Sequence, residues 1–258
     1  MGWGELDTSK DSFELISKLI LADYRYIRND VTEVTGGMPL YHSILTGIAN
    51  GDGQMHSAFK RANISNDVGS KAIEELCELG IIYKVKSKKI FTSWKENESV
   101  SNKFYFTSPF IKFWFAFVSP LFKGARDGDF NEIKTKFLNK KNEYYQAQFI
   151  HLAQESIKIQ FSESDPIVEI GSYWDSEHTL DIFAKTKSNK TIVGNVKYTN
   201  TKSKKSELTK LKDMTKSAKI DADIYIIFSK EGFSSELKSL KSESLKLYTI
   251  KSLKNLLK

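Results

Sequence analysis

Two short stretches in the C-terminal half of the chain hold side chains that could act on a phosphodiester. Asp181 stands at the start of one apolar stretch, and Asn195 and Lys197 stand near the end of the next. On a β-strand, residues two apart project to the same side, so Asn195 and Lys197 are expected to point together. If the two stretches form adjacent strands, Asp181 meets them.

An aspartate followed, on the neighbouring strand, by acid-x-lysine is the arrangement of metal-dependent nucleases of the PD-(D/E)xK type. Their carboxylates hold Mg²⁺ or Mn²⁺, and the metal lowers the pKa of its bound water and stabilises charge on the phosphate. Here Asn195 occupies the acidic position. Because an amide oxygen carries no charge, Asp181 would be at most a weak metal ligand, and cleavage is expected to be absent or feeble.

One other acid, Glu169 in the expected first strand, could be recruited to compensate for Asn195. The alternative for the whole set is structural, with Asp181 at a strand end and Lys197 as a lysine that extends its ammonium into water. Whether the protein is an enzyme is therefore left open, and so is the use of Mg²⁺ or Mn²⁺ as a cofactor.

The C-terminal half must supply the elements that position these residues. Its apolar pattern predicts an α/β domain with a mixed sheet and flanking helices. The expected order is helix, three-strand meander, helix, strand, helix, strand, with the bounds 132–157, 167–172, 179–185, 191–198, 203–219, 223–229, 234–242 and 245–250. Lysines surround much of the helix at 203–219, which is typical of a solvated helix, although they would add to a basic groove beside Lys197.

The N-terminal half has the order helix, helix, tight turn, helix and β-hairpin, which predicts a winged helix-turn-helix. After a helix at 11–29 and a breaker at 35–39, helices are expected at 41–49, 55–62 and from 65 or 66 to 79, with strands at 81–85 and 103–107. In the third of these helices the expected buried stripe is Val68, Ala72, Ile73, Leu76 and Leu79.

Residues 109–120 are crowded with aromatic side chains. A helix that is apolar nearly all round is usually buried, so we expect core here instead of an exposed platform for stacking bases. The breaker at 124–129 marks a domain boundary. The predicted organisation is an N-terminal helical segment (1–39), a winged helix with the aromatic helix (40–125) and a nuclease-like domain (126–258).

A winged helix reads DNA with the N-terminal turns of its third helix and touches phosphates with flanking cations. Asn66, Ser70 and Lys71 are the candidates for base contacts, because they are expected on the exposed face together with Gly69. The candidates for phosphate contacts are Lys60, Arg61 and the lysines of the wing, Lys84, Lys86, Lys88 and Lys89. The alternative is a protein-docking module, favoured by the acidic residues Glu74, Glu75 and Glu78.

Composition limits the class of protein further. The 258 residues carry a net charge of +7, almost entirely from lysine, and a basic surface attracts phosphate without regard to sequence. One cysteine and four histidines make a structural zinc site unexpected, and the lone cysteine fits a reducing compartment. No apolar run reaches membrane-spanning length and no secretory signal is recognisable, so a cytoplasmic protein without a membrane partner is expected.

Several motifs, in order, resemble the C-terminal region of unknown function that follows the P-loop domain in archaeal-type ATPases. The matching stretches span about residues 40–250. They are 41–47, 76–82 (Leu-Cys-Glu-Leu-Gly-Ile-Ile), 105–115 (Tyr-Phe-Thr-Ser-Pro-Phe-Ile-Lys-Phe-Trp-Phe), 169–174 (Glu-Ile-Gly-Ser-Tyr-Trp), 181–182, 194–198 (Gly-Asn-Val-Lys-Tyr) and 228–233 (Phe-Ser-Lys-Glu-Gly-Phe).

This resemblance implies a winged helix followed by a restriction-endonuclease-like domain in which Asp181 and Lys197 keep the family's aspartate and lysine. The chain departs from the family at Asn195, where glutamate is usual, and at Ile150, where an acid tends to follow the phenylalanine of the preceding helix. Whether Glu155, just over a turn later, substitutes for that acid is left open. The chain also lacks a P-loop motif. Residues 11–39 are then either a remnant of the ATPase's helical lid or a docking helix.

Three hypotheses follow from the sequence. The first is a DNA-binding protein whose nuclease-like domain is degenerate. The second is an active endonuclease that uses Mg²⁺ or Mn²⁺ and tolerates Asn195. The third is a non-enzymatic module whose partner is a protein, such as a component of a toxin–antitoxin or ATPase assembly.

Overall fold

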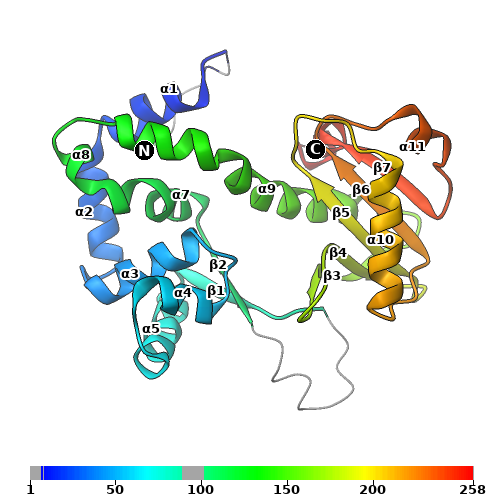
Figure 1. Cartoon of the computed structure of the whole chain (residues 1–258), viewed down its shortest axis with the longest axis horizontal. Helices are drawn as coiled ribbons and strands as arrows, with labels where there is room; N and C mark the ends of the chain where they lie inside the picture. The colour runs from blue at the N-terminus through cyan, green and yellow to red at the C-terminus, as the bar shows by residue number, and fades with distance from the viewer. Residues whose placement is uncertain (1–6, 8, 89–101, 258) are drawn as a thin grey trace. The chain divides into compact units, whose positions relative to one another are not determined.

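The computed structural model describes residues 7, 9–88 and 102–257, and Figure 1 shows their arrangement. The chain divides into two compact units. Unit 1 comprises residues 1–86 and 101–140, and unit 2 comprises residues 87–100 and 141–258. The division falls within one long helix, whereas the boundary expected from the sequence after residue 125 lies before that helix. Among the described residues, no helix has both the length and the apolar character needed to cross a membrane.

The first helical region of unit 1 is interrupted, whereas the sequence predicted one helix at 11–29. It consists of α1 (Ser12–Ile16), the π-helical turn η1 (Ser17–Leu21) and α2 (Tyr24–Val34). In the π turn the Ala22 N–H donates to the Ser17 carbonyl, five residues back, which shifts the later residues around the axis. The shift leaves Tyr24 stacked on Trp114 with ring centroids 5.6 Å apart.

Three helices and a small hairpin follow in unit 1, in the predicted order. They are α3 (Pro39–Ala49), α4 (Met55–Ala62), α5 (Asn66–Glu78), β1 (Ile82–Val85) and β2 (Lys103–Phe106), with β1 and β2 antiparallel. Proline at the first position of α3 has its φ already set for a helix. Asn63 ends α4 in the left-handed region at φ 55°, and Gly80 does the same after α5 at φ 68°.

The buried face of α5 differs from the predicted stripe at both ends. Val68 and Leu79 are 49% and 56% exposed, while Gly69, expected on the exposed face, is buried. The Phe59 ring of α4 lies so close to Gly69 that an added Cβ would fall 2.5 Å from it. Glycine at position 69 therefore sets how closely α4 and α5 pack. The buried face of α5 begins at Gly69 instead of at Val68, as had been predicted.

The aromatic segment is core, as predicted. It runs through α7 (Pro109–Phe113), the π turn η2 (Trp114–Val118), the 3-10 turn η3 (Ser119–Leu121) and α8 (Phe122–Arg126). Every residue of η2 is buried, and Phe113 and Phe117 meet Phe137 of the helix that follows. Their rings have no exposed faces to offer to nucleic-acid bases.

Unit 2 is built on a five-stranded mixed sheet with the order β3-β4-β5-β6-β7. The first three strands are an antiparallel meander, and β5, β6 and β7 are parallel. The strands are β3 (Ile167–Trp174), β4 (Thr179–Thr186), β5 (Thr191–Lys197), β6 (Ile224–Ser229) and β7 (Leu245–Thr249). The sequence predicted all of these strands within a few residues.

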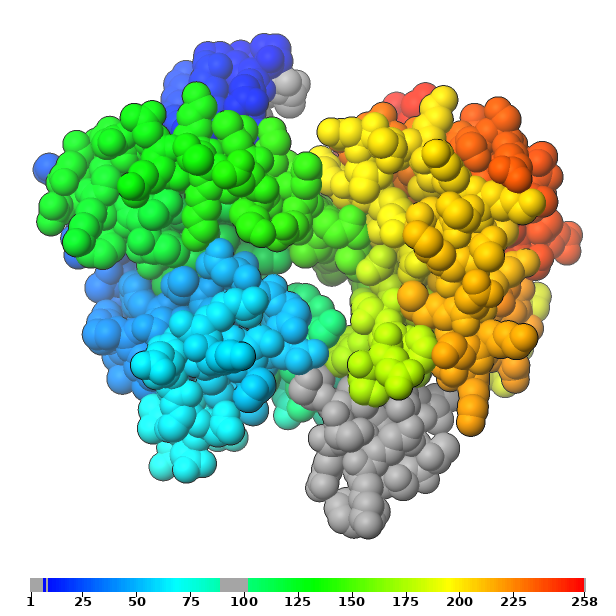
Figure 2. Space-filling model, in the orientation of Figure 1, coloured from blue at the N-terminus to red at the C-terminus, as the bar shows by residue number. Residues whose placement is uncertain are grey.

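Helices cover both faces of this sheet. One face packs on α9 (Asn131–Phe161) through Phe149, Ala153 and Ile157, and the final 3-10 helix η4 (Ile250–Leu257) adds Leu253 there. The other face packs on α10 (Lys205–Ser217) and α11 (Ser235–Ser239), through Leu208, Leu211 and Leu237. The lysine-rich α10 lies on the visible surface of its unit in Figure 2. The protein is thus a mixed α/β protein with N-terminal helices and a hairpin, then a five-stranded mixed sheet between helices.

Candidate functional site

The strands that carry Asp181, Asn195 and Lys197 are adjacent and antiparallel, and their paired region ends at Ile182 and Gly194. Asp181 and Asn195 are the next positions along. The side chains of β5 alternate, with Val196 in the core on the α9 side and Val193 in the core on the α10 side. Asn195 and Lys197 therefore share the α10 side of the sheet.

Asp181 stands at a β-bulge. The register of β3 and β4 passes from Gly171 opposite Phe183 to Tyr173 opposite Leu180, so Ser172 alone lies opposite both Asp181 and Ile182. A bulge of this kind redirects a side chain at a strand end. The Ser172 hydroxyl and the Gln154 side chain of α9 both donate to the Asp181 carbonyl, at 3.0 and 2.7 Å.

The Asp181 carboxylate closes the end of the β4–β5 ladder. Its Oδ2 accepts a hydrogen bond of 2.8 Å from the Val196 backbone N–H. Val196 is buried, and a buried N–H without an acceptor would cost about 1–3 kcal/mol. This bond gives Asp181 a structural task that requires no metal.

The Lys197 ammonium is paired with an acid that the sequence analysis did not single out. Its Nζ lies 3.0 Å from Oε2 of Glu207 on α10, and Lys210 approaches the other oxygen of Glu207 at 3.8 Å. The Glu207 side chain is 22% exposed and that of Lys197 is 37% exposed. A phosphate group would have to compete with Glu207 for Lys197.

The two acids considered as substitutes, Glu155 for the acid missing at Ile150 and Glu169 for Asn195, also have lysine partners. Glu155 of α9 pairs with Lys158 at 2.7 Å, and the exposed Glu169 of β3 pairs with Lys88 at 2.8 Å. No group of three or more His, Cys, Asp or Glu side chains within residues 7, 9–88 and 102–257 is arranged to hold a metal ion. The described side chains therefore offer a divalent cation no cluster of three such ligands.

We expect Asp181→Ala to lower the free energy of unfolding of unit 2 by about 1–3 kcal/mol, because the Val196 N–H loses its acceptor. Asp181→Asn should stay near wild type, since an amide oxygen can still accept that bond. Urea unfolding of both variants checks this, with Asp213→Ala on the exposed face of α10 as a control carboxylate. If Asp181→Asn proved as damaging as Asp181→Ala, the negative charge itself would be needed and the structural account would be wrong.

Two glutamines of α9 were missed by the sequence analysis. Gln146 donates from Nε2 to the Val196 carbonyl and accepts from the Tyr198 N–H, each at 2.8 Å. Gln154 reaches Asp181 and Ser172 of the bulge. The signal that could have found them is their helical spacing with Phe149 and Ala153, which places two amides on the buried face.

A hydrogen-bonded chain of serine, histidine and aspartate lies elsewhere in unit 2. His178 Nδ1 is 3.1 Å from Asp175 Oδ1, and His178 Nε2 is 2.9 Å from the Ser217 hydroxyl. Hydrogen bonds from the Glu177 and His178 N–H groups and the Tyr173 hydroxyl outweigh burial and lower the pKa of Asp175 to about 2.

The hydrogen-bonded series of Asp175, His178 and Ser217 has the order of an acyl-transfer triad. The groups around Ser217 do not match those of such an active site. Ser217 ends α10, where carbonyl dipoles disfavour a developing anion. The next three N–H groups, those of Ala218, Lys219 and Ile220, already bond to carbonyls and offer no oxyanion hole. We interpret this series of hydrogen bonds as a structural contact that joins the β3–β4 turn to the end of α10.

The residues predicted to contact DNA divide between the two units. Lys60, Asn66, Lys71, Lys84 and Lys86 are exposed in unit 1, on α4, α5 and β1 and just beyond it. Lys88 belongs to unit 2, where its N–H donates to the Ser172 carbonyl and its ammonium pairs with Glu169. Lys89 lies outside the described residues.

Two other predicted DNA contacts approach neighbouring elements of unit 1, the half-buried Ser70 and the exposed Arg61. The Ser70 hydroxyl is half-buried against the Met55 sulfur, 3.9 Å away. Arg61 lies over the turn after α3, where an added Cβ on Gly51 would fall 2.7 Å from its Nη1 atom. The acidic residues Glu74, Glu75 and Glu78 of α5 are all exposed, and Glu75 accepts a hydrogen bond from the Tyr41 hydroxyl, which raises the Tyr41 pKa.

The fold and these contacts define a two-unit α/β protein with a helical unit that includes a small hairpin, and a sheet unit in which Glu155, Glu169 and Glu207 pair with lysines. Residues 114–209 match the model of a family described as archaea bacterial proteins of unknown function, DUF234. This stretch runs from η2 to α10, so it includes Asp181, Asn195, Lys197 and Glu207. No match was found among curated proteins or among solved structures.

Proposed function

We propose that the protein binds DNA through unit 1, as a winged helix, and that unit 2 is a nuclease-like domain that does not cleave efficiently. The observation that carries the proposal is the exposed start of α5 with exposed lysines on the elements that contact it. The helix begins at Asn66, Lys71 follows on its exposed side, and Lys60 and Lys84 come from α4 and β1.

The charges of these lysines are available to phosphate. Within the described part of the chain, no ion pair or hydrogen bond involves the ammonium groups of Lys60, Lys71, Lys84 or Lys86. By contrast, the lysines near the proposed degenerate site, Lys197 and Lys88, are occupied by glutamates. Binding through unit 1 therefore costs no existing ion pair.

The same comparison argues against efficient cleavage. Asp181 is committed to the Val196 N–H, Asn195 brings no charge, and Glu155 and Glu169 are paired with lysines. A two-carboxylate magnesium site would have to break several of these contacts. The strand order of unit 2 and the helices on both faces of its sheet support a restriction-endonuclease-like fold for this unit.

The test is binding of labelled duplex and branched DNA at about 50 and 200 mM salt, with EDTA present to stop any cleavage. We expect submicromolar binding at low salt that weakens steeply at the higher concentration. In Lys71→Gln/Lys84→Gln, affinity should fall about tenfold or more and the salt slope should decrease by about two.

The control is Lys18→Gln/Lys123→Gln, which removes the same charge from exposed positions on other elements of unit 1. Equal losses in both double variants would mean that net charge alone is responsible. Absence of binding at low salt would overturn the proposal and favour a protein partner. Cleavage with Mn²⁺ that disappears in Asp181→Ala would overturn its second part, whereas cleavage that survives this change indicates a contaminant.

A further inference from the structure

A polar pocket of about 480 Å³ lies within unit 1, and none of the residues that line it belongs to α5. Its walls come from α3, the end of α4, the turn η3 and the first part of α9. The side chains that matter are Arg61, Lys136, His42, Ser43, Thr46 and Ser119. The volume lies in the range of small-molecule sites in proteins.

Two cations line this pocket without an acidic partner. Within residues 7, 9–88 and 102–257, neither Arg61 nor Lys136 takes part in an ion pair. Lys136 is half-buried, and this burial lowers its pKa because the charged form has lost part of its hydration. An unpaired, partly desolvated cation destabilises the fold, and a bound anion would reverse that cost.

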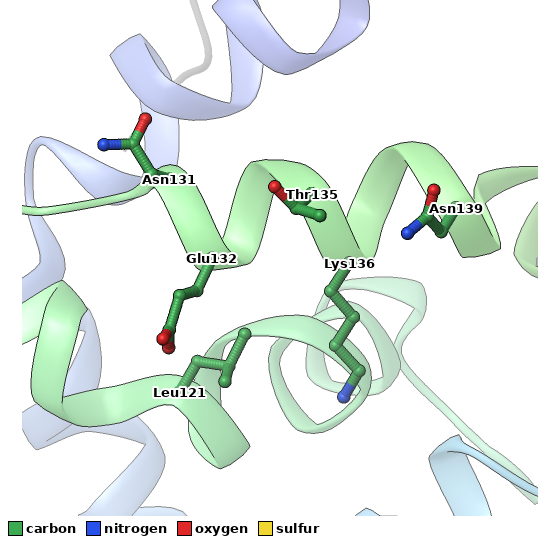
Figure 3. Close-up of a pocket in the computed structure, with 6 residues that line it drawn as sticks. All are labelled: Leu121, Asn131, Glu132, Thr135, Lys136 and Asn139. Atoms are coloured by element: carbon green, nitrogen blue, oxygen red, sulfur yellow. The ribbon is translucent and has the colours of Figure 1, made fainter.

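Lys136 also borders a second pocket, which Figure 3 shows with the side chains that line it. There the Lys136 side chain extends from α9 away from Asn139, and its ammonium end lies apart from the Glu132 carboxylate one turn earlier. Glu132 is the acid nearest to Lys136 along the helix, yet it forms no ion pair with it in the described structure.

The placement of Arg61 is built into the local sequence. Gly51 follows α3, and any side chain there would fall 2.7 Å from the Arg61 guanidinium. Glycine therefore leaves the room that lets Arg61 lie over the turn after α3, beside the pocket wall. A guanidinium offers several N–H donors in one plane, which suits the oxygens of a phosphate.

Neutral donors complete the lining. The hydroxyls of Ser43, Thr46 and Ser119 have no hydrogen-bond partner within the described residues. Burial first and then Arg28 lower the pKa of His42, and its Nε2 lies 2.9 Å from the Thr35 hydroxyl. Two cations with three hydroxyls match the many acceptor oxygens of a phosphate better than the two of a carboxylate.

We propose that this pocket is a binding site for a small phosphate-bearing molecule, held by Arg61 and Lys136 together. The phosphate would lie between the guanidinium and the ammonium, and the hydroxyls of Ser43 and Thr46 would bind its remaining oxygens. A volume of about 480 Å³ leaves room for the group that carries the phosphate. The pocket shares no lining residue with Lys60, Lys71, Lys84 and Lys86 of the proposed DNA surface, although α4 contributes Lys60 to that surface and Arg61 to the pocket.

The experiment is calorimetric titration of the full chain with pyrophosphate and inorganic phosphate at constant ionic strength, with chloride as the reference anion. We expect millimolar or tighter binding of pyrophosphate to the wild type. Arg61→Gln and Lys136→Gln should each weaken it tenfold or more, while Lys136→Arg should retain most of it. Arg25→Gln and Lys123→Gln, exposed positions on α2 and α8, should bind as the wild type does.

Several results would overturn this assignment. One is no pyrophosphate binding by the wild type, and another is equal weakening in all four charge-removing variants, which would indicate net charge alone. A phosphate of DNA could supply the same chemistry, and a competition experiment distinguishes the sources. If pyrophosphate displaces duplex DNA, and Arg61→Gln and Lys136→Gln weaken both ligands alike, the pocket is part of the DNA surface and no small-molecule site exists. Near-ultraviolet circular dichroism of each variant confirms that it is folded.

Discussion

Gly194→Ala is expected to destabilise unit 2 by about 3 kcal/mol, because the new methyl group has no space. Gly194 of β5 lies opposite Ile226 of β6 in the parallel pair. An added Cβ would fall 2.6 Å from the Ile226 carbonyl oxygen and 3.0 Å from the Ile226 Cβ. Ile226 is fully buried in the centre of the sheet, so its backbone cannot retreat without separating the two strands.

Hydrogen exchange measured by mass spectrometry at increasing urea checks this prediction, since it reports on unit 2 separately from unit 1. The matched control is Gly171→Ala in the same sheet, where the three atoms nearest to the added Cβ all belong to the flexible Lys88 side chain. That change should cost less than about 1 kcal/mol. A Gly194→Ala protein as stable as the control would show that β5 and β6 are farther apart than described.

The elements of unit 2 could be predicted from the sequence because burial imposes a period on each of them. Strands such as β5 and β6 are apolar on both faces, and α9 repeats apolar residues at helical spacing. Two-faced burial is typical of a parallel sheet covered by helices on each side. The order of the elements then restricted the topology to a meander followed by parallel strands.

The contacts of the candidate site could not be predicted in the same way. The bulge at Asp181 depends on a register shift between β3 and β4, which no local pattern encodes. Glu207 reaches Lys197 only because α10 packs across the sheet, and an acid on a lysine-rich helix looks like ordinary surface in the sequence. Polar contacts between distant segments follow from tertiary geometry, whereas periodicity reports only burial.

Unit 1 shows the same limit at a smaller scale. The sequence predicted the bounds of α3, α4 and α5 well. It predicted Val68 as buried and Gly69 as exposed, whereas in the structure Val68 is exposed and Gly69 is buried. A missing side chain carries no apolar signal, so the close approach of Phe59 to Gly69 was invisible. The π turns η1 and η2 were missed for a related reason, since one extra residue per turn leaves the composition unchanged.

Gln146 of α9 provides the strongest test of the view that polar groups around the candidate site hold the fold together. Its amide donates to the Val196 carbonyl and accepts from the Tyr198 N–H, so it joins the helix to the end of β5 on either side of Lys197. Gln146→Leu leaves both backbone groups without this partner, and we expect a loss of about 2–4 kcal/mol in unfolding free energy.

Gln146→Glu separates the two bonds. A carboxylate still accepts from the Tyr198 N–H but cannot donate to the Val196 carbonyl, so the repulsion between oxygens raises the pKa of the new acid. Protonation restores a donor. The stability of Gln146→Glu relative to wild type should therefore improve as the pH falls from 7 towards about 4.5, near the ordinary pKa of glutamate.

Urea unfolding of both variants at several pH values measures these effects, with Gln160→Leu on an exposed part of the same helix as the control. Wild-type stability in Gln146→Leu would mean that water replaces the amide without cost. Lys197, which pairs with Glu207 of α10, would then lie on a strand end that α9 does not support. Loss of stability in Gln146→Leu but not in the control Gln160→Leu would instead show that α9 supports this strand end through an uncharged amide. Such an amide stabilises the sheet and supplies no charge for metal binding.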